Sequence, residues 1–388
     1  MPPLKQYNIS VVKQKIIFIR NAYSEDFGGG ERMPVNTARI LDNYHDYETL
    51  VVSRNNRLLS LASSYSLATT RGWWWKAQDW SGPRALFTPV YCIWLIVLTI
   101  YYVRLFSINR PTIVHIQSKD DFIAGSLAAR VKKIKVVWSD HADLKYIYQN
   151  NSVWYKNPVG KIVKWCDRFA SHIVLTSQND KMLIESSLGK ILPPKYKVIY
   201  NGVIDQPKLL KIRPNKTITF TSTSRLVSSK GIGEMIEAFI NVQKKYKNTE
   251  LWILGEGPEE DSFKKMAGGN NSIRFLGFPD NALSLVAKCQ IFIHPSYMEG
   301  FSVSLIEACM LGKPIIACDV GGNPEIISSS SGILVSPRSS LELTKAMRSL
   351  LDDPISRDQM SLSSRKNFET NYNLRSIIAK KYIPIYEN

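Results

Sequence analysis

The sequence predicts an α/β fold with two parallel β-sheets, and three observations support this prediction. The chain has 388 residues, about twice the length of an ordinary domain. Short β-branched apolar runs alternate with helix-length segments in both halves, as in parallel βα units. A polar, proline-containing stretch, residues 206–215, separates the halves. We therefore expect two Rossmann-like domains facing across a cleft, because open parallel sheets bind ligands at the carboxyl ends of their strands.

The elements follow in order along each half. In the first half we expect strands at residues 15–20, 49–53, 112–116, 134–138 and 172–176. In the second half we expect strands at residues 217–221, 250–254, 272–276, 290–294, 314–318 and 332–335. The predicted domains are residues 1–204 and 205–372, followed by a C-terminal helix, 373–388, for which crossing back to the first domain is one option.

Composition narrows the class of protein further. Apolar residues make up 44% of the chain and charged residues 21%, which excludes wholesale disorder and a fibrous repeat. The 5 cysteines form no Cys-x-x-Cys pair, so neither a disulfide framework nor a structural metal is expected. Residues 1–15 are polar and lack the pattern of a signal peptide, which favours a cytoplasmic location.

The charge is large and unevenly distributed. The net charge is +17, and residues 1–202 carry 27 basic against 14 acidic side chains. Such a surface suits an anionic partner: a nucleic acid, an acidic lipid or a phosphorylated substrate. Composition alone does not choose among these partners.

One segment of the first half, Ala85 to Val103, is uncharged over 19 residues and follows Trp73, Trp74, Trp75 and Trp80. By length it could just span a bilayer. A single crossing, however, would place strands of one sheet on opposite sides of the membrane. The other readings are a helix buried against the sheet and a helix lying in the membrane interface, with the basic residues meeting acidic lipid; we favour the interfacial helix.

Two loops carry groups suited to phosphate. Gly28-Gly29-Gly30 follows the first predicted strand and precedes a helix, where backbone N–H groups can approach a phosphate; an ordinary turn is the alternative. Arg225 and Lys230 follow the first strand of the second half, where two cations could neutralise a diphosphate. Solvated loop cations are the alternative for that pair.

The most specific stretch runs from His294 to Pro314. It places Glu299 and Glu307 on either side of a predicted helix start near Ser302, with Gly300 in the turn. Two carboxylates beside helix N-terminal donors are suited to binding sugar hydroxyls without a metal ion. We reject the alternative of two surface glutamates at chance spacing because of the glycines and the proline that surround them.

On these residues the chain, from Gly28 to about Arg375, resembles the retaining nucleotide-sugar glycosyltransferases of family 4, which have the GT-B fold. The resemblance is strongest from Thr221 to Glu325. Six matching pieces occur in the family's order: residues 28–31, 222–231, 255–258, 275–278, 299–307 and 321–325.

The resemblance implies a role for each matching residue. Arg225 and Lys230 would hold the donor diphosphate, Glu299 the sugar hydroxyls, Glu307 the ribose, and the Gly29-Gly30 loop the phosphate. The remaining donor-binding positions implied are Gly277, Gly300, Phe301 and Ser302.

The resemblance also implies a catalytic histidine after a first-domain strand, and His141 occupies that place, although a shift of one residue would bring Asp140 to face the cleft. Because His115 lies within a predicted strand, we interpret it as a core residue or as one that supports a site residue from behind. We interpret His172 and His294 as structural.

The chain departs from the family pattern at Ser302, where a glycine or another small residue is usual, and at Asn323, where a β-branched residue is common. Both departures concern the shape of the sugar pocket.

No Asp-x-Asp sequence occurs in the chain. Transferases of the other common fold use such a pair to hold a divalent cation, so we expect Arg225, Lys230 and helix N-termini to stabilise the leaving diphosphate without a metal ion or other cofactor.

These observations predict a retaining, metal-independent hexosyltransferase of cell-surface polysaccharide or glycolipid assembly. It would use a nucleoside-diphosphate-sugar donor and a lipid-linked saccharide acceptor, and bind the cytoplasmic face of an anionic membrane peripherally, without a nucleic-acid partner. One alternative is a nucleotide-sugar epimerase or hydrolase, for which no acid and base carboxylates are found at family-like positions. The other is a non-enzymatic basic protein that binds membrane or nucleic acid, which leaves Glu299, Glu307 and the glycine loops unexplained.

Overall fold

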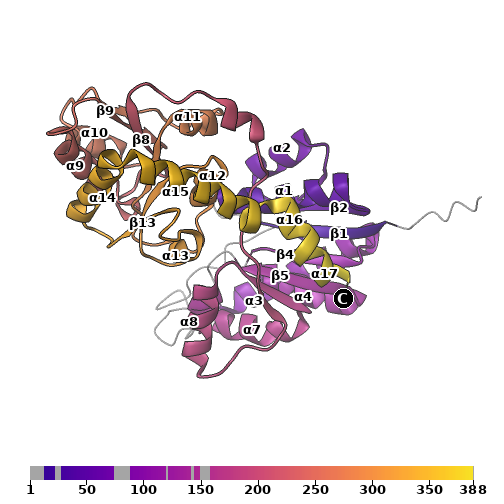
Figure 1. Cartoon of the computed structure of the whole chain (residues 1–388). Coiled ribbons are helices and arrows are strands. Elements are labelled where there is room, and N and C mark those ends of the chain that lie inside the picture. The colour runs from indigo at the N-terminus through magenta and orange to yellow at the C-terminus, as the bar shows by residue number, and fades with distance from the viewer. Residues whose placement is uncertain are drawn as a thin grey trace, which may run out of the picture. The chain divides into compact units, whose positions relative to one another are not determined.

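In this computed structural model the chain forms two parallel sheets flanked by helices (Figure 1). The structure describes residues 13–21, 28–73, 88–118, 121–140, 144–148 and 158–387. By contacts the chain divides into two compact units, residues 1–139 with 151–173 and residues 140–150 with 174–388. The fold class is therefore confirmed as α/β with two parallel sheets.

The first sheet contains seven strands among the described residues, in the order β3-β2-β1-β4-β5-β6-β7. Its strands are β1 (Gln14–Ile19), β2 (Tyr47–Ser53), β3 (Ala68–Arg71), β4 (Ile113–Ile116), β5 (Lys135–Asp140), β6 (His172–Leu175) and β7 (Tyr196–Val198). Strand β1 pairs in parallel with both β2 and β4, so the segment between β2 and β4 begins and ends at the same sheet. All five strands predicted for this half are confirmed, and β3 and β7 are two short strands that the sequence did not reveal.

The helices that accompany the first sheet are α1 (Gly29–Tyr44), α2 (Asn56–Ser64), α3 (Thr88–Asn109), α4 (Phe122–Lys132), α5 (Leu144–Tyr148), α7 (Pro158–Cys166) and α8 (Gln178–Leu188). Helix α3 packs beside α4, and α4 packs beside α7. Of the segment Ala85 to Val103, residues 85–87 lie outside the described residues, and the rest forms the first part of α3.

Helix α3 has one buried and one exposed apolar face. Tyr91, Leu95, Leu98 and Tyr102 are buried, whereas a stripe of aliphatic side chains along the other face is exposed. That stripe consists of Val90, Ile93, Ile96, Val97, Ile100 and Ile108. By length and composition alone, α3 could cross a membrane, and about a third of its most apolar window is buried. Helix α3 is therefore not buried on all sides.

The second sheet contains six strands in the order β10-β9-β8-β11-β12-β13 among the described residues. They are β8 (Ile218–Thr223), β9 (Thr249–Leu254), β10 (Ile273–Phe275), β11 (Ile291–His294), β12 (Ile315–Cys318) and β13 (Gly332–Val335), and they confirm all six predicted strands. The accompanying helices are α9 (Ile232–Gln243), α10 (Glu260–Met266), α11 (Ala282–Lys288), α12 (Val303–Met310), α13 (Asn323–Ile326), α14 (Ser340–Asp352) and α15 (Pro354–Asn367).

Two segments outside the sheets complete the chain. The polar stretch that separates the two halves, residues 206–215, contains a 3-10 turn, Pro207–Lys211, that packs on α11. After α15 the chain continues through π-helical turns into α16 (Leu374–Ile377) and α17 (Ile383–Glu387). The domain limits 1–204, 205–372 and 373–388 stay a prediction.

Candidate functional site

The predicted site in the second half is built from loops at the carboxyl ends of neighbouring strands. Arg225 and Lys230 follow β8, Gly277 follows β10, and Glu299 follows β11. All strands of this sheet are parallel, so these loops leave it at the same edge, and the loops after β8 and β11 are neighbours because those two strands pair. This edge is where parallel α/β sheets bind ligands.

Lys230 and Glu299 form an ion pair. The Nζ atom of Lys230 donates to Oε1 of Glu299 at 2.6 Å, with 27% and 13% of the two side chains exposed. Arg225, from the same loop as Lys230, is exposed. The structure thus brings together two of the predicted site residues, one from each loop.

A third residue joins this pair. His294, the last residue of β11, places Nε2 at 2.9 Å from Oε1 of Glu299 and 3.2 Å from Oγ of Ser302. From the sequence His294 was interpreted as structural, and its contact with Glu299 was not predicted. The sequence feature that could have predicted this contact is the spacing of five residues between His294, at a strand end, and Glu299.

The environment of Glu299 fixes its charge. Burial raises the pKa of this carboxyl, but hydrogen bonds and charge interactions with His294 and Lys230 outweigh burial and hold the pKa well below its ordinary value of 4.5. Glu299 is therefore a carboxylate at neutral pH, able to accept hydrogen bonds and unable to donate them.

Two glycines brace the loop that carries Glu299. Gly231 has φ +66°, and a Cβ there would overlap the carbonyl oxygen of Pro295. Gly321 has φ +55°, and a Cβ there would overlap the carbonyl oxygen of Glu299 itself. Both positions require a residue without a side chain because the backbone is left-handed and the neighbouring backbone lies in contact.

Helix α12 begins directly after this loop. Ser302 caps it, with Oγ accepting from the Leu305 amide at 3.4 Å, so the predicted helix start is confirmed. Phe301 is buried and stacks on Tyr200 with ring centroids 4.9 Å apart. The carbonyl oxygen of Gly300 accepts from the Gly322 amide at 2.9 Å. Capping, stacking and this backbone bond hold the turn between Glu299 and α12.

Two further predicted donor-site residues lie in the second unit. Glu307 is half-buried in α12, on the helix that Ser302 caps. Gly277 has φ +61°, and its carbonyl oxygen accepts from the Gly255 amide at 2.7 Å, which joins the loops after β9 and β10.

The glycine loop of the first unit lies at the start of α1. Gly29 and Gly30 are the first two residues of that helix. The Gly28 amide donates to Oε2 of Glu31 at 3.0 Å, and Arg20 Nη2 contacts Oε1 of Glu31 at 3.0 Å. Arg20, which follows β1, was not singled out from the sequence, although a cation at a strand end was visible there.

The histidine predictions have different outcomes. His141 lies outside the described residues, so its predicted catalytic role stays a prediction. Asp140 is buried, and its Oδ1 accepts from the Leu144 amide at 3.0 Å. His115 is a buried residue of β4 beside Ser139 Oγ at 2.7 Å, and burial lowers its pKa to about 3, which confirms the core interpretation.

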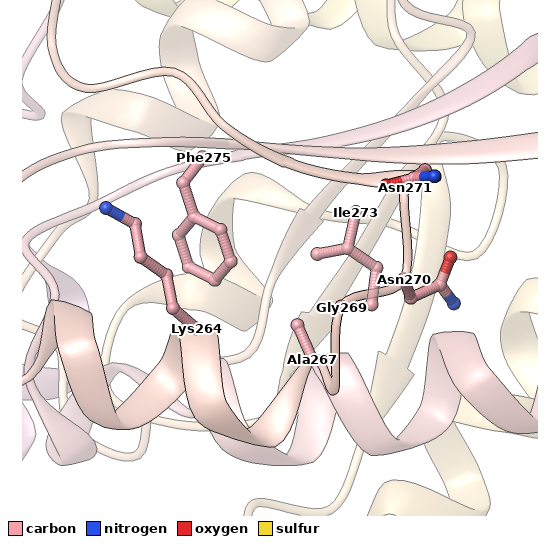
Figure 2. Close-up of a pocket in the computed structure, with 7 residues that line it drawn as sticks. All are labelled: Lys264, Ala267, Gly269, Asn270, Asn271, Ile273 and Phe275. Carbon is pink, nitrogen blue, oxygen red and sulfur yellow. The ribbon is translucent and has the colours of Figure 1, made fainter.

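A hollow on the second unit lies apart from these residues (Figure 2). It is formed by α10, β10 and the turn between them, and Nζ of Lys264 lies 5.9 Å from the ring centroid of Phe275. None of the predicted site residues lines this hollow, so we do not assign it to the candidate site.

Comparisons with known proteins agree with this geometry. Residues 27–206 match the family model described as Glycosyltransferase Family 4, and residues 207–367 match Glycosyl transferases group 1. The structure superimposes on Anabaena HepE, solved in complex with UDP, with a TM-score of 0.75 and 19% identity over 97% of this chain and 100% of that one.

Curated relatives are also glycosyltransferases. An uncharacterized glycosyltransferase of Methanocaldococcus jannaschii is 28% identical over 66% of this chain and 69% of its own length. A GDP-mannose-dependent monoacylated α-(1-6)-phosphatidylinositol monomannoside mannosyltransferase of Corynebacterium glutamicum is 29% identical over 42% of this chain. That alignment spans 47% of the mannosyltransferase, about half its length.

Fold, family models and relatives together define a glycosyltransferase. The two models meet at residues 206 and 207 and jointly cover residues 27–367. The chain belongs to the family 4 glycosyltransferases and has the GT-B fold.

Proposed function

We propose that this glycosyltransferase moves a hexose from a nucleoside diphosphate to an acceptor with retention of anomeric configuration. The observation that carries the proposal is the ionised Glu299, held by Lys230 and His294 beside the start of α12. The solved complexes of HepE with UDP and with UDP-glucose support a nucleotide-sugar donor.

We propose a separate role in binding or catalysis for each site residue. Bond cleavage at the anomeric carbon leaves negative charge on the diphosphate, and the cations Arg225 and Lys230 stabilise that charge. Glu299, an acceptor only, binds sugar hydroxyls and orients the ring as it takes on oxocarbenium character. Glu307 binds the ribose, and the Gly29-Gly30 loop binds phosphate. His141 is the proposed catalytic histidine.

Metal independence is part of the proposal. It rests on the sequence, which lacks Asp-x-Asp, and on the cations that could replace a divalent ion at the diphosphate. A nearby Lys230 already paired with Glu299 supplies one positive charge at the site.

The donor and the products can be tested together. Purified protein is incubated with UDP-, GDP- and ADP-sugars and a polyprenyl-diphosphate-linked saccharide, and the products are identified by mass spectrometry. We expect one donor to be consumed and one hexose to be added, with the donor's anomeric configuration retained by NMR. Release of free sugar, or an epimerised donor, would instead support the epimerase or hydrolase reading, and inversion would contradict retention.

The proposed acceptor is lipid-linked, and the proposed location is the cytoplasmic face of an anionic membrane. The exposed aliphatic stripe of α3 supports this, together with Trp73, which is 54% exposed and stacks on Trp94 and Tyr101. Trp74, Trp75 and Trp80 lie outside the described residues. The lipid acceptor named for the Corynebacterium relative adds support.

Positive charge lies on α4, which packs beside α3, and on α7, which packs beside α4. Exposed cations occur on α4, on α7 and in the turns that follow them, and Figure 1 shows α3, α4 and α7 close together. They are Arg130, Lys132, Lys133, Lys161 and Arg168. Each cation near an acidic leaflet adds about 1 kcal/mol of binding, so several would hold the protein at low salt.

Vesicle flotation tests the membrane proposal. The variant carries Ile93→Ser, Ile96→Ser and Ile100→Ser on α3. A matched control carries Leu341→Ser, Ile355→Ser and Leu362→Ser, three aliphatic residues of α14 and α15 that are at least as exposed. We expect wild type and control to float with anionic vesicles and the α3 variant to float less. The remaining binding of the α3 variant should disappear at high salt. Wild-type protein that stays soluble at low salt would overturn the proposal.

A further inference from the structure

The polar side of His294 faces only the Glu299 loop. The imidazole is buried at the end of β11, between strands β8 and β12. Its Nε2 atom contacts Glu299 and Ser302, while Nδ1 is buried without a hydrogen-bond partner among the described residues. A polar ring in a core strand is costly unless it is hydrogen-bonded, so the contacts of Nε2 account for histidine here.

The direction of the bond to Glu299 follows from charge. Since the carboxylate can only accept, the hydrogen lies on Nε2 and is donated to Oε1. Lys230 donates to the same oxygen. Among the described residues no group bonds to Oε2 of Glu299, so that oxygen is left for a ligand.

The two donors differ in how firmly they are held. Lys230 is at the end of a long side chain in a loop, and 27% of that side chain is exposed. His294 has two side-chain torsions, is 3% exposed and belongs to a strand paired on both sides. The rigid donor therefore fixes the orientation of the carboxylate.

We propose that His294 is a positioning residue for sugar recognition: its Nε2–H fixes Oε1 of Glu299 and links it to the helix cap Ser302, so that Oε2 faces the donor's hexose hydroxyls. This inference rests on the proposed function, because it takes Glu299 as the residue that binds the sugar. It adds that the donor's hexose, and not its nucleotide, is the part recognised through His294.

The test separates these two parts of the donor. Calorimetry measures the dissociation constants of UDP-glucose and of UDP, with GDP-mannose and GDP in parallel, for wild type, His294→Phe and His294→Gln. Phenylalanine keeps the ring's bulk without the donor, and glutamine keeps an N–H donor on an uncharged side chain. His45→Gln, at the end of α1, is the matched control.

We expect His294→Phe to weaken binding of the sugar nucleotide about tenfold or more and to leave binding of the free diphosphate within about twofold, because a hydrogen bond to a charged group is lost. His294→Gln should retain most of the sugar affinity, and the control should match wild type. Thermal melts report whether each variant folds.

Three results would overturn the inference. His294→Phe could bind the sugar nucleotide as wild type does, could lose affinity for both ligands in equal proportion, or His294→Gln could show the same selective loss as His294→Phe. If wild type itself binds no nucleotide sugar and no nucleoside diphosphate, the proposed function fails and this inference fails with it.

Discussion

Replacing Glu299 by glutamine removes a charge and changes almost nothing else. The amide keeps the length of the side chain and an oxygen that can accept from Lys230 and His294. The carboxylate, however, makes both bonds as a charged acceptor and is 13% exposed. We expect the variant to lose sugar transfer to a far greater extent than it loses stability.

The two losses can be estimated. Hydrogen bonds to charged groups contribute about 1.5–3 kcal/mol and neutral ones about 0.5–1.5, so each weakened bond costs about 1–1.5 kcal/mol. Because Lys230 can turn to solvent, the loss of stability comes mainly from the His294 bond and is about 1–1.5 kcal/mol. In the wild-type enzyme, bonds from the donor's sugar hydroxyls to Oε2 reach their full strength in the transition state. In the variant these bonds are weakened in the same way. Two such bonds correspond to a loss of about a hundredfold in kcat/KM.

The stability difference should also depend on pH. The folded-state pKa of Glu299 lies below its ordinary value of 4.5, so its contribution is complete above that value and is lost as pH falls toward the folded-state pKa. Urea unfolding should therefore give a constant difference between wild type and Glu299→Gln from pH 8 to 6 and a smaller one below about pH 4. A pH-independent difference, or an unfolded variant with normal activity per folded molecule, would refute the reasoning.

Three other outcomes are expected. Arg225→Ala and Lys230→Ala should each lower turnover about a hundredfold or more with an unchanged circular dichroism spectrum, since charge on the leaving diphosphate loses its partner; near-normal turnover in both would remove that assignment. Transfer should persist in excess EDTA, and a complete loss that added metal reverses would contradict metal independence. Gly321→Ala should lower the free energy of unfolding by more than about 2 kcal/mol, because Cβ would overlap the Glu299 carbonyl oxygen in left-handed backbone; an unchanged urea midpoint would show that the loop adjusts.

The strands that the sequence predicted are those with buried, β-branched runs. Strand β1 is an example, because four of its six residues are buried. The missed strands have little apolar signal: β3 is Ala68–Arg71, with both ends exposed, and β7 is the three-residue Tyr196–Val198. Both lie at sheet edges, where pairing on one side suffices and the side chains are free to be polar.

The sequence predicted the motifs that form the site, but it did not predict the contacts between their side chains. The glycines and the helix start near Ser302 are local signals, so the loop around Glu299 could be placed from sequence. That Lys230, 69 positions earlier, reaches the same oxygen as His294 depends on the pairing of β8 with β11. Sheet order is a long-range property, and no local pattern in this chain specifies which strands are neighbours.

The backbone contacts at Gly231 and Gly321 have a consequence for re-engineering donor choice. Each glycine belongs to a different strand-end loop, and both abut the stretch from Pro295 to Glu299. A loop transplanted alone from a relative would meet two neighbours shaped for the original main-chain path. Loop exchange should therefore succeed only when all three segments move as a set, and libraries confined to side chains in the existing loops are the more promising route to a new sugar preference.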